Sequence, residues 1–420
     1  MKFNNISLTI ENDSKMSQKL ILMSFIGILL SIVGYYVDDR FFHSYLVCYL
    51  FFITLSLGGL FFVLAHHMFG ADWSVVLRRI AENLMLLVPL MLFLSIPILL
   101  KFDYLYEWTN PDFWTHHTLL EPKTAYLNKT FFFIRVTIYF AIWFFLISRL
   151  YTFSVKQKDD SDKIKMKRFS ALGIALFALS VSFFGFDVIM SLDASWFSTM
   201  FGVYIFAGCY LSATAFVTLI SLFLHSKGIL VDEINEKHYA NLGKILFAFT
   251  VFWAYIGGFQ YYIIWYANLP EEIYWFIQRW EGPWKYMSIV LILGHFAVPF
   301  FILIFNRLKR NKSVLAVIST LVLIMHWLDM YWLVMPTYFR DCQGYIVDSQ
   351  LYLEDLRKED PACFSGESLE QLSIMSWTDL SLFIGIGGLL MALFWRFLKS
   401  RPIVASNDSA YKQSISKEED

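Results

Sequence analysis

A set of ionisable side chains lies within or at the edges of long apolar runs of this chain. An unpaired charge in such a run costs several kcal/mol once it is buried. Residues of this kind therefore mark proton or ion pathways, unless they pair with one another as part of the architecture. The candidates for a proton path are His66, His67, Glu82, Arg135, Asp187, His295, His326 and Asp329.

Three of these residues have types and spacing that suit proton transfer. Histidine titrates near neutral pH, and Asp329 follows His326 by three residues, so the two share a helix face. This spacing predicts either a proton relay or a histidine oriented by a carboxylate. His295 and His326 would also lie at comparable depths on adjacent antiparallel spans, as the two axial ligands of a b-type haem do. The surrounding sequence lacks a pattern of small residues to accommodate a porphyrin, so haem binding is kept as an alternative.

The other candidates lie nearer the span ends. At 1.5 Å of rise per residue, Arg135 and Asp329 would lie about 9 Å below one membrane boundary, and Asp187 about 5 Å below it. Arg135 and Asp187 are on successive spans, so they form either a structural ion pair or part of the path. His66, His67 and Glu82 are near the opposite boundary. They are either a proton uptake site or ordinary boundary groups whose polar ends reach water.

The stretch 247–272 places polar groups inside an apolar helix that ends at a proline. A quinone site needs an apolar slot with one or two hydrogen-bonding groups within reach of the lipid. Gln260 and Tyr262 are weak candidates for such a site. The glycines at 257 and 258 would let another helix approach there. An ordinary aromatic belt at the headgroup level is the alternative interpretation.

The elements that must position these residues are membrane-spanning helices. Hydrophobic residues make up 57% of the 420 residues and charged residues 16%, which is typical of a polytopic membrane protein. The net charge of −1 argues against a nucleic-acid partner. We expect an all-α integral membrane protein with ten transmembrane helices. The expected spans are 18–37, 43–69, 80–100, 129–153, 168–190, 197–225, 245–267, 285–306, 313–335 and 379–396.

Lysine and arginine predict the orientation of these spans. Basic residues cluster in the links 154–168 and 307–312 and after the last span, and all three places lie on one side if every span is real. The positive-inside rule then puts both termini in the cytoplasm. The predicted organisation is a cytoplasmic N-terminal segment 1–17, a transmembrane domain 18–397 with periplasmic loops 101–128 and 336–378, and a cytoplasmic tail 398–420.

The cysteines predict no metal centre. The chain has four cysteines and no CxxC, so it offers no ligand set for an iron–sulfur cluster or a covalently attached haem. Cys342 and Cys363 share one long polar loop, and they are a candidate disulfide if that loop faces an oxidising compartment.

Two longer runs resemble a known family. MSLDASWFSTMFGVY at 190–204 and QYYIIWYANLPEE at 260–272 are similar to the NrfD/PsrC-type membrane subunits of alternative complex III, a bacterial quinol:electron-acceptor oxidoreductase, and most similar to the smaller of its two such subunits. The ten-helix pattern matches over nearly the whole chain. The resemblance implies two four-helix bundles, with the first and last spans packed outside them.

The resemblance also implies a cellular role. It makes this chain a subunit without redox centres that scaffolds the complex and conducts protons during quinol oxidation, without being catalytic alone. Haem and iron–sulfur clusters would reside in partner subunits, and menaquinol or ubiquinol would be the substrate of the complex. Expected partners are a multihaem cytochrome c, an iron–sulfur subunit, the larger NrfD-like subunit, small membrane and monohaem subunits, a terminal oxidase and lipids. A secondary transporter and a b-type haem cytochrome are the alternatives.

Overall fold

The computed structural model describes residues 14–116, 118–157, 160–338, 375–405, 408 and 410–415, and its regular elements in these ranges are all helical. Ten helical segments are long and apolar enough to cross a membrane, which confirms the predicted fold class. The predicted disulfide Cys342–Cys363 lies outside the described residues. The elements are α1 (Ser14–Val37), α2 (Phe41–Phe69), η1 (Asp72–Ser74), α3 (Val75–Met85), α4 (Val88–Leu94), α5 (Ile96–Leu100), α6 (Phe102–Leu105), η2 (Glu107–Thr109), α7 (Pro111–His116), η3 (Thr118–Ala125), α8 (Lys129–Lys156), α9 (Asp160–Phe184), η4 (Gly185–Ile189), η5 (Met190–Leu192), α10 (Phe201–Ser226), α11 (Glu236–Ala267), α12 (Pro270–Gln278), α13 (Gly282–Leu291), η6 (Ile292–Ala297), α14 (Val298–Leu303), α15 (Asn306–Arg310), α16 (Lys312–Tyr338), α20 (Trp377–Lys399) and α21 (Tyr411–Ile415).

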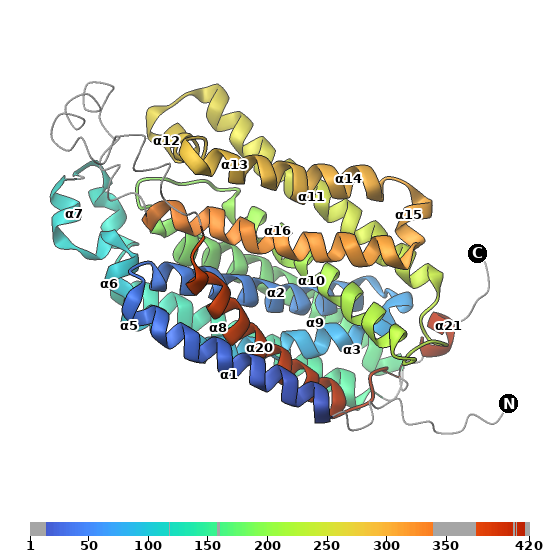
Figure 1. The fold of residues 1–420 in the computed structure, drawn as a ribbon. Coiled ribbons are helices and arrows are strands. Elements are labelled where there is room, and N and C mark those ends of the chain that lie inside the picture. The colour runs from blue at the N-terminus through green and yellow to red at the C-terminus, as the bar shows by residue number, and fades with distance from the viewer. Residues whose placement is uncertain are drawn as a thin grey trace.

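The long helices form two groups of four that share a central seam (Figure 1). The first bundle consists of α2, the broken span α3–α5, α8 and α9. The second consists of α10, α11, the broken span α13–α14, and α16. Helices α2 and α10 pack on each other at the seam and are the two most buried spans. Helices α1 and α20 pack on each other outside these groups, and α20 packs against α2, as the family resemblance implies.

Glycines allow the closest helix crossings. A Cβ atom on Gly58 of α2 would lie 1.9 Å from the carbonyl oxygen of Cys209 on α10. A Cβ atom on Gly27 of α1 would lie 2.3 Å from the backbone nitrogen of Gly385 on α20. Small residues are needed at these points because the packing between membrane helices depends on close backbone approach.

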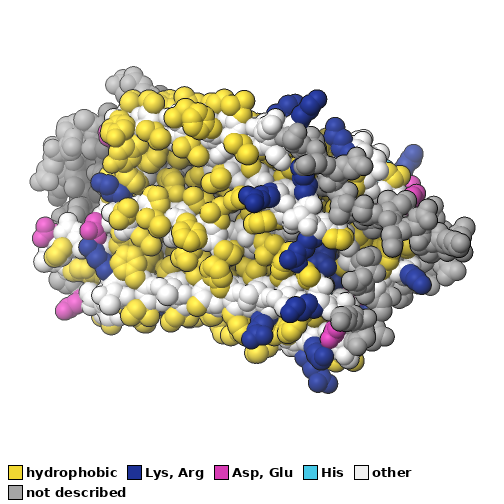
Figure 2. Space-filling model, turned by 90° about the horizontal axis from the view of Figure 1, so that it is seen from below, with side chains coloured by type: hydrophobic (Ala, Val, Ile, Leu, Met, Phe, Trp, Pro, Cys, Tyr) yellow, Lys and Arg dark blue, Asp and Glu magenta, His cyan; other side chains and the backbone are white. Residues whose placement is uncertain are grey.

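The two ends of the helical body differ in charge. Helix α1 begins, and α21 lies, at one end, here called the terminal end, and α7 lies at the opposite end, here called the far end (Figure 1). Lysine and arginine side chains gather toward the terminal end, and apolar side chains cover much of the body between the ends (Figure 2). The even number of spans and this asymmetry are the pattern of a multi-pass membrane protein.

Several spans are irregular where the sequence predicts continuous helices. The third span breaks before Pro89 and again before Pro97, because proline cannot donate the helical backbone hydrogen bond. The fifth span ends in the π turn η4, which carries Asp187. The eighth passes through the π turn η6, which carries His295 and precedes Pro299. Single π turns in helices often occur at functional sites.

Candidate functional site

A carboxylate lies buried at the centre of the second bundle. Asp329 of α16 is 1% exposed. Its Oδ1 accepts a hydrogen bond from the Tyr204 hydroxyl of α10, and its Oδ2 accepts one from Trp253 Nε1 of α11 at 3.2 Å. Among the described residues, it forms no ion pair. Both donors are neutral groups, so in the described part of the chain the hydrogen bonds to Asp329 bring no positive charge to it.

His326 lies one turn along α16 from Asp329, but the two do not pair. His326 Nε2 lies 2.9 Å from Thr54 Oγ1 of α2. The Thr54 hydroxyl lies 2.7 Å from the Leu50 carbonyl oxygen, so it donates there and accepts from Nε2–H. The ring packs over Gly208, where a Cβ atom would lie 3.0 Å from His326 Cε1. The predicted pairing of His326 with Asp329 is therefore wrong. The three-residue spacing would allow contact, but His326 bonds to Thr54 of α2, whereas Asp329 bonds to helices α10 and α11.

His295 completes this central cluster, which we define as Thr54, Tyr204, Trp253, His295, His326 and Asp329. The His295 ring is fully buried and lies 4.1 Å from the Trp253 ring, centroid to centroid. Neither of its ring nitrogens has a hydrogen-bond partner among the described residues. An imidazole in such a position can exchange a proton with another group only through a bridging water molecule or after a small movement of its ring.

The two histidines do not fit a bis-histidine haem. His326 uses Nε2 for Thr54, and a Cβ atom on Gly208 would lie only 3.2 Å from its Nδ1. An iron could reach neither nitrogen of His326 without displacing α2 or α10. In the described part of the chain, no group of three or more His, Cys, Asp or Glu residues is arranged to hold a metal ion.

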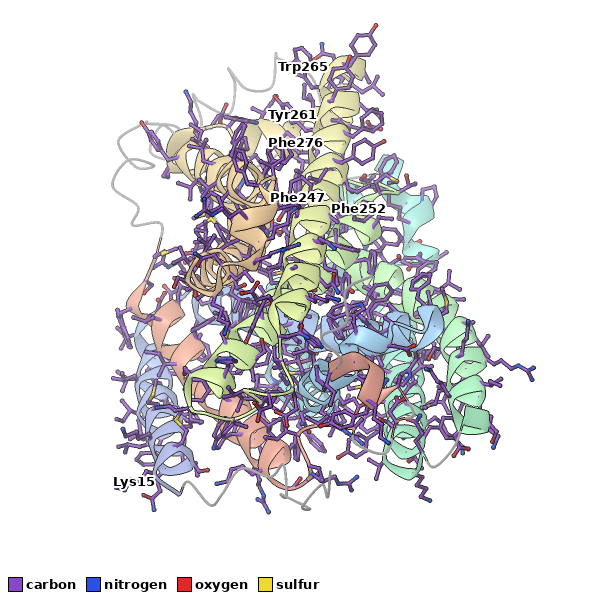
Figure 3. All side chains as sticks on the ribbon, turned by 90° about the vertical axis from the view of Figure 1, so that its right-hand side faces the viewer. Lys15, Phe247, Phe252, Tyr261, Trp265 and Phe276 are labelled. Atoms are coloured by element: carbon purple, nitrogen blue, oxygen red, sulfur yellow. The ribbon has the colours of Figure 1, made fainter. Side chains whose placement is uncertain are left out.

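An aromatic cavity of about 510 Å³ opens beside the central cluster. Helices α10, α11, α12, α13 and α16 contribute to its wall. Figure 3 shows α11 leaning away from the body, with Tyr261 and Phe276 between it and the neighbouring helices. The rings of these two residues lie 5.2 Å apart. Tyr204 and Trp253 belong both to the cavity wall and to the Asp329 hydrogen bonds, so the cavity and the buried carboxylate are adjacent.

Only one of the two quinone candidates lines this cavity. Gln260 does so, and its Oε1 is buried with no hydrogen-bond partner among the described residues. Tyr262 is 53% exposed, and its ring stacks on Tyr266 of the same helix. Tyr262 is therefore not a residue of the cavity, because it lies on another face of α11. Gly258 lines the cavity, and a Cβ atom there would meet nothing within 4 Å.

The two sequence runs that carry the family resemblance meet at this cavity. Trp196 of the first run stacks on Trp275, with ring centroids 4.2 Å apart. Its Nε1 donates to the carbonyl oxygen of Glu272, in the second run, at 3.1 Å. Tyr204 ends the first run and Gln260 begins the second. Segments about sixty residues apart in sequence thus build one wall.

Arg135 and Asp187 form a buried ion pair toward the far end of the first bundle. Arg135 Nε and Nη2 donate to the two Asp187 oxygens at 2.8 and 3.0 Å. Tyr139 donates to Asp187 Oδ2 at 2.6 Å, and the Arg135 guanidinium lies 3.8 Å from the Tyr126 ring centroid. This confirms the predicted pair. Each charge is satisfied, which is the arrangement of a structural contact.

His66, His67 and Glu82 lie together at the terminal end. Glu82 is fully buried; its Oε2 is 2.6 Å from Arg79 Nη1, and its Oε1 accepts from Ser154 at 2.6 Å. The His66 ring stacks on Phe62, and its Nδ1 lies 2.7 Å from the Phe62 carbonyl oxygen. His67 is also buried.

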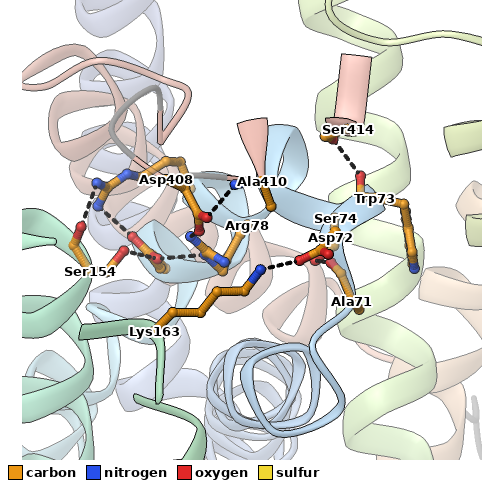
Figure 4. Close-up of polar contacts among 12 residues, drawn as sticks. Ala71, Asp72, Trp73, Ser74, Arg78, Ser154, Lys163, Asp408, Ala410 and Ser414 are labelled. Atoms are coloured by element: carbon orange, nitrogen blue, oxygen red, sulfur yellow. Dashed lines mark hydrogen bonds and ion pairs between the residues drawn. The ribbon is translucent and has the colours of Figure 1, made fainter. Parts of the chain in front are cut away.

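Residues of the C-terminal tail contact the membrane body near Arg78 and Trp73 (Figure 4). Arg78 Nη2 donates to Asp408 Oδ2 at 2.7 Å, and Ser414 donates to the carbonyl oxygen of Trp73 at 3.1 Å. Burial opposes ionisation of Asp408, but the Arg78 guanidinium outweighs it and lowers the pKa of Asp408 below its usual value. The tail is therefore held by a charged contact.

The eight residues predicted for the proton path thus lie in three separate places: the central cluster, the Arg135–Asp187 pair and the terminal end. They do not form one continuous chain of contacts. The sequence analysis missed Tyr204, Trp253, Thr54, Arg78 and Asp408. Tyr204 ends one of the two runs that carry the family resemblance, so this position could have been predicted as part of the site. The others are common residue types whose role depends on neighbours from distant helices.

The fold and its buried polar groups define an all-α, multi-pass membrane protein. Comparison with known proteins adds no narrower assignment: no protein-family model matches the chain, and no curated protein matches it.

Proposed function

We propose that this chain is a membrane subunit of an alternative complex III type of quinol:electron-acceptor oxidoreductase, similar to its smaller NrfD/PsrC-type subunit (the ActF type), and that its second bundle moves protons. The observation that carries the proton role is the buried Asp329 carboxylate, bound by Tyr204 and Trp253. The assignment to this complex rests on the two sequence runs at 190–204 and 260–272, which meet in the structure at the aromatic cavity. The terminal end would face the bacterial cytoplasm.

In this proposal Asp329 accepts and releases the proton, and Tyr204 connects it with the cavity. The Tyr204 hydroxyl can donate toward Asp329 and accept from a group in the cavity, because a phenol does both. His295 and His326 flank the carboxylate and supply neutral nitrogens that bind protons transiently. The Arg135–Asp187 pair and the Glu82 contacts maintain the architecture around this path.

Substitution of Asp329 tests the proton role. In the assembled complex reconstituted in vesicles, Asp329→Asn should lower proton translocation roughly tenfold or more, with a smaller loss of quinol oxidation, because the amide keeps the shape but cannot carry the proton. Tyr204→Phe should act in the same direction and keeps Asp329. Asp232→Asn, at an exposed position, is the charge control. Equal losses of both activities in a correctly assembled complex would contradict the proposal.

The cavity favours a second role, which is binding of a quinol head group. Its aromatic wall suits a flat ring, and Gln260 Oε1, which accepts no hydrogen bond from the described residues, suits a hydroxyl donor on that ring. Gly258→Leu should fill the cavity without a backbone clash and weaken binding of a quinol analogue. Ala248→Leu, at an exposed position of α11, is the matched control. Unchanged analogue binding in Gly258→Leu would exclude this cavity as the site.

Native purification tests the assignment to a complex. Multihaem and iron–sulfur proteins should accompany a tagged chain from its own membranes. A chain that purifies without redox partners and takes up a solute when reconstituted alone would instead be a secondary transporter.

A further inference from the structure

A crevice of about 540 Å³ separates α1 from α20 at the terminal end. The two helices touch most closely near Gly27 and Gly385, and Gly388 packs against Ser24 one turn further on. The crevice begins beyond this contact, at Ile21 and Leu389. It lies in the outer helix pair and is separate from the aromatic cavity of the second bundle.

The lining of the crevice changes from apolar to polar toward the terminal end. Ile21, Leu389 and Leu393 line its inner part, and Ser17, Arg396, Lys399 and Ser400 line its outer part. This order is the same as the order of groups along a phospholipid, from acyl chains through the phosphate to water.

The polar part of the crevice is cationic. Arg396 is exposed and has no ion pair among the described residues, and Lys399 lies one turn further along α20. In Figure 3, Lys15 lies at the neighbouring end of α1. An arginine binds a phosphate through paired N–H donors, and the Ser17 hydroxyl adds a further donor, whereas the Ser400 hydroxyl already donates to the Phe397 carbonyl oxygen at 2.8 Å.

We propose that this crevice is a binding site for an anionic phospholipid. Arg396 binds the phosphate, Lys399 adds positive charge one turn away, the Ser17 hydroxyl donates to a phosphate oxygen, and an acyl chain lies along Ile21 and Leu393. Basic pockets between membrane helices near a membrane surface suit anionic head groups, since charge and apolar burial act together. The lipid would fill the gap between α1 and α20 and hold the outer helix pair together.

Lipid binding by the full-length protein tests the proposal. After delipidation in detergent, phosphatidylglycerol should raise the thermal unfolding temperature more than phosphatidylcholine or inorganic phosphate does. Arg396→Gln should weaken phosphatidylglycerol binding roughly fivefold, because it removes one cation beside the phosphate. Lys167→Gln removes an exposed charge at the same end, outside the crevice, and should bind like the unaltered protein.

A second variant separates the site from general charge effects. Leu393→Trp fills the apolar part of the crevice, and should reduce the phosphatidylglycerol bound per chain, counted by native mass spectrometry. Equal stabilisation by both lipids, or equal losses in Arg396→Gln and Lys167→Gln, would overturn the proposal. Stabilisation by inorganic phosphate alone would show a simple anion site instead.

Discussion

Two buried aspartates of this protein differ in what surrounds them. Asp187 has a guanidinium against both of its oxygens, whereas Asp329 has hydrogen bonds from a phenol and an indole. Breaking a buried ion pair leaves an uncompensated charge, so the contact with Arg135 gives Asp187 a structural role. Asp329 has no such partner among the described residues, so adding a proton to it would break no ion pair there. This difference is why the proposed proton path runs through Asp329.

The ion pair predicts a stability effect at residue scale. Asp187→Asn should lower the free energy of unfolding by about 3–5 kcal/mol, because Arg135 is left buried beside a neutral amide. Thermal unfolding in detergent measures this, with Asp232→Asn as the exposed control. The double variant Arg135→Met/Asp187→Leu should recover most of the loss. An Asp187→Asn protein as stable as the unaltered one would show that the pair contributes little.

At the scale of elements, the C-terminal tail joins the membrane body through a few contacts. Asp408 binds Arg78, and Ser414 of α21 binds the backbone at Trp73. The pKa of Asp408 is lowered in the folded protein, mainly by Arg78 acting against burial. The contact therefore stabilises the docked tail above the pKa of a free aspartate, about 3.9, and is lost as the pH falls through the lower folded value.

This contact predicts a change in protease sensitivity. Asp408→Asn at neutral pH should release the tail and make trypsin cleavage after Lys412 several times faster, because the charged bond to Arg78 is gone. Cleavage of the unaltered protein should stay slow throughout the neutral range, where Asp408 is ionised. Asp232→Asn should cleave like the unaltered protein. Identical cleavage rates in all three would mean that other contacts hold the tail.

At the scale of the whole molecule, many basic residues, the start of α1 and the short helix α21 share one end. The links between α8 and α9 and between α14 and α16 are far apart in sequence, yet both lie at the terminal end with exposed Lys165 and Arg310. The proposed orientation puts this end in the cytoplasm, since cytoplasmic loops are rich in lysine and arginine.

Site-directed labelling tests this orientation. Cysteines at Lys165 and Arg310 should react with an impermeant reagent from the cytoplasmic side only, and a cysteine at Lys101 from the opposite side only. The buried Cys48 and Cys209 should contribute little background labelling. Labelling of positions 165 and 310 from opposite sides would refute the ten-span topology.

The sequence by itself determined the fold class and the spans. Ten apolar runs of sufficient length admit only helices in a bilayer, because each backbone polar group must be paired within its own segment. The ion pair of the first bundle could also be predicted from the sequence, because Arg135 and Asp187 lie at similar depths on successive spans. The broken third span and the two π turns were not predicted. Pro89 and Pro97 gave a local signal for the breaks and Pro299 for the π turn η6, but no proline lies near η4.

The tertiary structure alone decided which polar groups meet. His326 and Asp329 share a helix face, yet one binds Thr54 of α2 and the other binds Tyr204 and Trp253 of α10 and α11. Helical spacing defines a face but not the neighbours that this face meets. Hydrogen bonding acts over about 3 Å, so it depends on the relative rotation and crossing of helices, which no single segment encodes. For the same reason, the aromatic cavity, the docked tail and the crevice between α1 and α20 are visible only in the folded molecule.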